Sequence, residues 1–62
     1  MKYMIENNYT DETKGFITAT EAWIYLNKEI RRLNDNYGKD CWSIDDFTVY
    51  EFDAKNCKWI KI

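Results

Sequence analysis

Helical periodicity is confined to one stretch of this chain, and this restricts the fold more than any other feature. Between residues 18 and 38, apolar side chains recur at alternating spacings of three and four, as they do on one stripe of a helix. The stripe consists of Trp23, Leu26, Ile30, Leu33 and Tyr37. Thr18 and Glu21 match a capping box at its start, and Gly38 suits its end. We therefore predict one helix, buried through this stripe, which can cover at most one face of a sheet.

The segments on both sides of the helix have the composition of strands. Residues 2–6 run into the polar stretch 7–15, which suggests a first strand and a loop or hairpin turn, with a few more paired residues at Phe16-Ile17. Residues 41–44 suggest a short strand that ends in a turn at Asp45-Asp46. Residues 47–52 and 57–62 are strong strand candidates, and a turn at 53–56 joins them.

This element order predicts an α+β fold of β-α-β-β type, with a minor extra strand as the alternative. The fold is a two-layer sandwich of one helix on a small antiparallel sheet ending in a C-terminal β-hairpin. The 62 residues make a single domain, 1–62. In chains shorter than about 70 to 80 residues, one core contributes only about 3 to 5 kcal/mol, and disulfides, metals or oligomerisation add the rest. Because we expect neither a disulfide nor a metal here, we expect oligomerisation.

The predicted hairpin has more apolar surface than one helix can cover. A turn that places Asp53 opposite Cys57 puts on one face Tyr50, Phe52, Ile60 and Ile62. The other face then holds Phe47, Val49, Cys57 and Trp59, beside Glu51 and Lys61. With the helix on the first face, the second would face solvent, which monomeric proteins seldom tolerate. We therefore predict a homodimer, formed either by sheet-on-sheet packing or by edge pairing through the C-terminal strand. Its predicted interface residues are Phe47, Val49, Trp59 and Lys61.

The chain lacks the side chains that most catalytic and metal sites use. It has no His, and its two glycines cannot form a phosphate-binding loop. Cys41 and Cys57 are too few for a usual zinc site, and we expect free, buried or half-buried thiols, with a disulfide between them as the alternative. The sequence therefore predicts no enzyme activity, no metal and no cofactor. A ligand pocket is expected only between subunits.

The charge balance points to no partner class. Nine Lys and Arg stand against eleven Asp and Glu, and the net charge of -2 lacks the basic field of a nucleic-acid-binding protein. A basic patch on the exposed side of the helix would comprise Lys28, Arg31 and Arg32, with Glu29 and Asp35 interleaved. We expect a solvated face there, and nucleic-acid binding through these three cations is the alternative function.

Aromatic residues are the strongest indication of function. Phe, Trp and Tyr make up 18% of the chain, and three of them are Trp, which is more than one helix on three or four strands can cover. Trp and Tyr are enriched at the hot spots of protein interfaces. We therefore predict a non-catalytic protein-interaction module that acts by occluding a partner or by assembling with itself.

In size and composition, the chain resembles the small phage-encoded inhibitors of bacterial defence systems, for example antagonists of Hachiman. The resemblance rests on the short, aromatic-rich chain and on the Asn- and Lys-rich segments KYMIENNYTDETK and DAKNCKWIKI. It implies an inhibitor of a host defence enzyme, such as a nuclease or helicase, and assigns no role to individual residues. Because MKYMIENNY lacks the apolar segment of a secretory signal, we expect a cytoplasmic protein. The charged content of 32% predicts no membrane association, and the resemblance implies a host protein as target.

Overall fold

A four-stranded antiparallel sheet and a helix form two layers in the computed structural model, which describes residues 2–39 and 41–62. The elements in chain order are β1 (Tyr3–Asn7), β2 (Thr13–Phe16), α1 (Ala19–Tyr37), the 3-10 turn η1 (Ile44–Asp46), β3 (Phe47–Asp53) and β4 (Lys58–Lys61). The strands lie in the order β2-β1-β3-β4. The predicted α+β class, with one helix on an antiparallel sheet and a C-terminal hairpin, is confirmed. The extra pairing expected at Phe16-Ile17 is a full edge strand that begins earlier, at Thr13.

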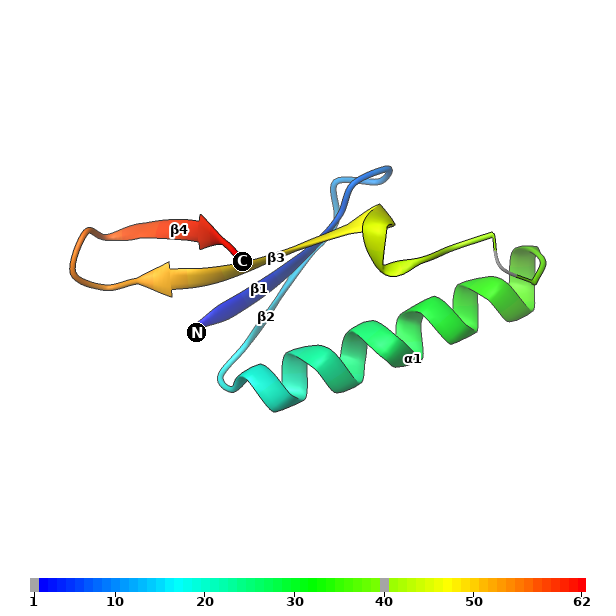
Figure 1. Cartoon of the computed structure of the whole chain (residues 1–62), viewed down its shortest axis with the longest axis horizontal. Helices are drawn as coiled ribbons and strands as arrows, with labels where there is room; N and C mark the ends of the chain where they lie inside the picture. Colours follow the sequence, from blue (N-terminus) through cyan, green and yellow to red (C-terminus); the bar gives the residue numbers. More distant parts are fainter. Residues whose placement is uncertain (1, 40) are drawn as a thin grey trace.

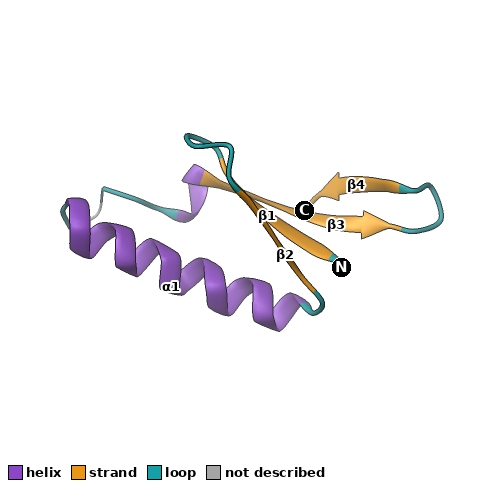
Figure 2. Ribbon diagram, turned by 180° about the vertical axis from the view of Figure 1, so that it is seen from behind, coloured by secondary structure: helices purple, strands orange, loops and turns teal. Residues whose placement is uncertain are grey.

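The helix and the hairpin β3–β4 extend in opposite directions from the shared part of the sheet (Figures 1 and 2). α1 packs mainly on β1 and β2, whereas β3–β4 projects past the N-terminal end of α1. None of the described helices has the length and apolar character needed to cross a membrane.

Both ends of α1 lie where the sequence predicts them. The Glu21 N–H donates to Thr18 Oγ1 at 3.2 Å, and the Thr18 hydroxyl donates to the Glu21 carboxylate at 3.0 Å. The second contact therefore uses the hydroxyl, where a capping box would use the backbone N–H of the cap residue. At the other end, Gly38 adopts φ 125°, which favours glycine, and its N–H donates to the Asn34 carbonyl at 2.9 Å.

The core contains the middle of the predicted helical stripe and not its two ends. Its buried side chains are Ile5, Ala22, Leu26, Leu33, Phe47 and Val49. Leu26 and Leu33 are placed as predicted, and Ile30 packs against this core partly buried. Trp23 and Tyr37, however, are 41% and 70% exposed, so their predicted burial is wrong. The helix approaches the sheet over the small side chain of Ala22, and this turns the neighbouring Trp23 about 100° away around the helix axis.

The C-terminal hairpin has a different register from the predicted one. Asp53 pairs with Lys58, and Phe52 pairs with Trp59. The turn therefore contains one more residue than predicted, and Cys57 takes the left-handed conformation within it, with φ 52°. Because side chains alternate along a strand, this shift of one residue moves every β4 side chain to the opposite face of the sheet.

The strand predicted at residues 41–44 does not form. The Asn34 side chain accepts the Trp42 N–H at 2.7 Å and donates to the Trp42 carbonyl at 3.1 Å, so both backbone groups of Trp42 are occupied. The turn predicted at Asp45-Asp46 is confirmed as η1, where the Ser43 N–H donates to the Asp46 carboxylate at 3.0 Å.

Candidate functional site

One face of the sheet carries no helix in the residues that the structure describes, and we call it the open face. On β1, β3 and β4, strand alternation and the pairing register place seven side chains there: Met4, Glu6, Thr48, Tyr50, Phe52, Trp59 and Lys61. All except Lys61 are half-buried, although α1 lies on the other side of the sheet (Figure 2). These side chains therefore shield one another, and the face is a preformed surface rather than a set of isolated exposed residues.

Aromatic contacts and a polar contact hold the open face together. The Phe52 and Trp59 rings meet edge to face, with centroids 5.2 Å apart. The Tyr50 hydroxyl donates to Glu6 Oε1 at 3.0 Å, and this hydrogen bond, with burial and the Glu6 charge, raises the pKa of Tyr50. Tyr50 therefore stays a neutral donor at neutral pH, and its ring keeps one orientation beside Phe52 on β3.

The four predicted interface residues lie on both faces of the sheet. Phe47 and Val49 are 8% exposed and belong to the core that α1 covers, so the expectation that they face solvent is wrong. Trp59 and Lys61 lie on the open face. The open face instead contains Tyr50 and Phe52, which sequence reasoning placed under the helix. The change in hairpin register brings Trp59 to their side.

A groove opens between the β1–β2 hairpin and the C-terminal half of α1, which diverge in Figure 1. Its volume is about 550 Å³, within the usual range of small-molecule sites. Apolar lining comes from Ile5, Leu33, Trp42 and Phe47. Polar lining comes mainly from Glu12 and Lys14 on the hairpin side and from Tyr25, Glu29, Arg32 and Tyr37 on α1. The expectation that a pocket requires two subunits is therefore wrong, and no sequence motif indicated this one.

Two charged groups of the groove, Arg32 and Glu29, are paired with each other, and a third, Lys14, lies beside an aromatic ring. Arg32 donates through Nε, at 2.6 Å, and through Nη2 to Glu29 Oε1. Lys14 Nζ lies 4.9 Å from the centroid of the Tyr25 ring. Burial, followed by a hydrogen bond to Glu29 and the charge of Glu29, raises the pKa of Tyr25. The Tyr25 phenol is therefore a neutral donor at neutral pH, which does not suit it to act as a base or a nucleophile there.

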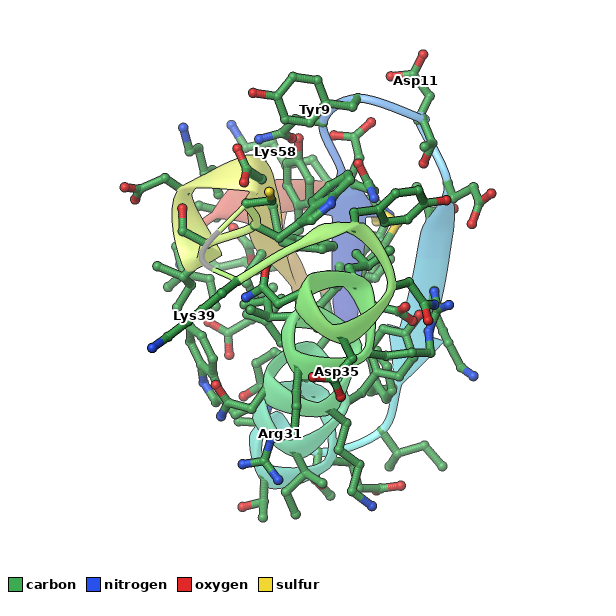
Figure 3. All side chains as sticks on the ribbon, turned by 90° about the vertical axis from the view of Figure 1, so that its right-hand side faces the viewer. Tyr9, Asp11, Arg31, Asp35, Lys39 and Lys58 are labelled. Atoms are coloured by element: carbon green, nitrogen blue, oxygen red, sulfur yellow. The ribbon has the colours of Figure 1, made fainter. Side chains whose placement is uncertain are left out.

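The predicted basic helix face is interrupted by acidic side chains. Lys28, Arg31 and Arg32 are all exposed on α1, but Arg32 is paired with Glu29 at the groove. Arg31 and Asp35 both project from the side of α1 that faces away from the sheet (Figure 3). Lys28 and Arg31 are thus the exposed cations of the predicted set that form no ion pair with the residues the structure describes, and Asp35 lies close to them in sequence.

The two cysteines and the carboxylates form no recognisable centre in the described part of the chain. Cys41 and Cys57 are free thiols and both are exposed, so their predicted burial is wrong. Cys41 Sγ lies 3.5 Å from the Tyr37 carbonyl at the end of α1, whereas Cys57 lies in the turn of the hairpin. Within residues 2–39 and 41–62, no three His, Cys, Asp or Glu side chains are grouped closely enough to hold a metal ion.

Comparison of the chain with protein-family models, with curated proteins and with solved structures found no match in any of the three.

Proposed function

We propose that this chain is a non-catalytic protein-interaction module that binds a partner protein through the open face. The observation that carries the proposal is the grouping of Tyr50, Phe52 and Trp59 on the sheet face opposite α1. Aromatic side chains that are held in place lose little conformational entropy on binding, and they dominate the binding energy of many interfaces.

The open face suits a partner with an acidic rim around an apolar centre. Lys61 lies at one side of the aromatic group. Lys2 is exposed just before β1, and it lies beside Phe52, because the Lys2 carbonyl accepts the Phe52 N–H at 2.8 Å. The acidic hairpin residues Glu51 and Asp53 alternate to the other face of the sheet, and Glu6, the acidic side chain of the open face, accepts the Tyr50 hydroxyl. Cations at the rim of an interface increase the association rate with an oppositely charged partner more than they increase the affinity.

The mode of action that we propose is occlusion of a host defence enzyme in the cytoplasm. A standard interface buries about 800 Å² on each partner, which is about a sixth of the 4689 Å² surface of this chain. The principal extents of 41 × 20 × 15 Å allow the module to cover an active-site entrance without inserting any segment. The resemblance to small phage-encoded inhibitors supports this class of target.

Affinity capture followed by titration of the captured protein tests the proposal. Tagged wild-type chain should retain a stoichiometric protein from host lysate, and Phe52→Ala should weaken the purified complex about tenfold or more, as hot-spot truncations do. Ile24→Ala is the matched control, since Ile24 is an exposed apolar residue on α1. Circular dichroism should show that both variants are folded.

Two outcomes would contradict the proposal. One is a captured protein whose affinity is unchanged by Phe52→Ala, because the binding surface would then lie elsewhere. The other is capture of nucleic acid alone, with binding that falls steeply as salt is raised. The second outcome would restore the basic helix face as the functional surface.

A further inference from the structure

The outer edge of β4 has backbone groups that no strand pairs within the described chain. The Ile62 N–H donates to the Val49 carbonyl at 2.9 Å, and hydrogen bonding alternates along an antiparallel ladder. Ile60 therefore directs its backbone N–H and C=O toward β3, whereas Trp59 and Lys61 direct theirs outward. Phe52, which lies opposite Trp59, follows the same alternation, because its N–H points away from β4 and donates to the carbonyl of Lys2, just before β1.

We propose that two copies of this chain pair antiparallel through β4, with the twofold axis at Ile60. In this register, Trp59 of each copy lies opposite Lys61 of the other, and each such pair exchanges both N–H···O bonds because these are the outward-facing residues. Ile60 then faces Ile60 of the second copy in the non-hydrogen-bonded position. The four-stranded sheet is doubled into one continuous sheet.

The side chains of β4 fit the register with the axis at Ile60 better than the registers with the axis one residue away. No lysine faces a lysine: Lys58 lies opposite Ile62 of the second copy, and each Lys61 lies beside an indole ring, which attracts cations. Moving the axis to Lys61 would place the two Lys61 side chains opposite each other. Moving it to Trp59 would require pairing by Cys57, whose φ of 52° lies outside the extended region.

The exposed apolar side chains of β4 also support pairing through this strand. Ile60 and Ile62 are 45% and 65% exposed on the helix side of the sheet, where α1 does not reach them. Edge pairing places the two Ile60 side chains opposite each other across the axis and covers Ile62 with the Lys58 side chain of the second copy. Since the second copy binds the edge, it leaves the open face uncovered and places two open faces side by side. The inference therefore goes beyond the proposed function and does not depend on it.

Sedimentation equilibrium on the full chain tests the pairing. The wild type should change with concentration from 7.6 kDa to twice that mass. Ile60→Lys places two cations opposite each other at the axis and should weaken association about tenfold or more. Within one chain, Lys at this position faces Glu51 and leaves the fold intact. Ile24→Lys, an exposed site on α1, should leave association unchanged.

Disulfide trapping tests the position of the axis. In a Cys41→Ser, Cys57→Ser background, Ile60→Cys should crosslink rapidly, because Cα atoms in a non-hydrogen-bonded pair lie about 4.5 Å apart, within disulfide range. Ile24→Cys in the same background should crosslink at the slower rate of random encounter.

The inference would be overturned by a mass of 7.6 kDa at all concentrations, by association unaffected by Ile60→Lys, or by crosslinking of Ile60→Cys no faster than that of Ile24→Cys. Phe52→Ala separates this inference from the proposed function, since it should weaken partner capture and leave the mass unchanged. A mass lowered by Phe52→Ala would instead show that two copies pack through their open faces, and it would also overturn the edge pairing.

Discussion

At the scale of single residues, the stability of this fold depends on a few fully covered side chains. Leu26 has no exposed surface, whereas Trp23, three residues earlier, is 41% exposed. We predict that Leu26→Ala lowers the free energy of unfolding by about 2 to 5 kcal/mol, because it leaves a cavity in the core. Trp23→Ala should cost less, although it removes more atoms. Urea denaturation followed by circular dichroism measures both, and a larger loss for Trp23→Ala would contradict the observed helix orientation.

Gly38 is a second residue on which the stability of the fold depends. Its φ of 125° strains any other residue, and an added Cβ would lie 3.1 Å from Cys41 Sγ. Gly38→Ala should therefore destabilise the fold by about 1 to 3 kcal/mol. Gly15→Ala is the control, because Gly15 lies in β2 and has no positive φ. Equal thermal midpoints for Gly38→Ala and the wild type would contradict the prediction that a side chain at this position strains the backbone.

The raised pKa of Tyr25 makes a pH-dependent contribution to stability. The folded state holds the phenol proton more tightly than the unfolded state, so the contribution is complete below about pH 10 and is lost as pH rises through the folded pKa. Tyr25→Phe should flatten this alkaline loss, and Tyr50, whose pKa is also raised, should account for a remaining part. Unfolding free energies measured on both sides of pH 10 test this, with the exposed Tyr9→Phe as control. Identical pH slopes for the wild type and Tyr25→Phe would contradict it.

At the scale of elements, the sequence allows the helix and the hairpin strands to be predicted because their signals are local. The capping residue, the 3.6-residue period and Gly38 act within α1 itself. The hairpin register is not local in this sense. Asn56 is the usual left-handed residue, but the Asp53 carboxylate accepts the backbone N–H groups of Lys55 and Asn56, at 3.1 and 3.4 Å, and the left-handed step moves to Cys57. The faces of the candidate site were therefore misassigned.

Two other segments depend on their context, so that β2 was predicted only in part and the loop at 41–43 was predicted wrongly. β2 contains Lys14 and Gly15, which are poor strand residues, and it is paired because β1 offers a free edge. The loop at 41–43 is held from outside its own segment by Asn34. We predict that Asn34→Leu removes the hydrogen-exchange protection of the Trp42 amide and costs about 1 to 3 kcal/mol. Asn36→Leu, an exposed site on the same helix, should do neither. Unchanged protection at Trp42 would show that the loop is held by other contacts.

At the scale of the whole molecule, the chain is more extended than a compact domain of its length. Its radius of gyration is 12.3 Å, whereas about 10.5 Å is typical for a chain of this size. The extension arises because α1 and the hairpin β3–β4 project past each other, so that the core lies only where they overlap. A chain built in this way gains stability when a partner covers what its own elements leave exposed.

Thermal unfolding connects this shape to assembly. If two copies pair through β4, the paired state is favoured at higher concentration, and the melting temperature of the wild type should rise over a concentration range of about a hundredfold. Ile60→Lys should melt at one temperature across that range, because it retains the folded chain and loses the second copy. Ile24→Lys should behave like the wild type. A concentration-independent melting temperature for the wild type would mean that the core under α1 is sufficient for stability, and that the exposed isoleucines of β4 have no part in folding.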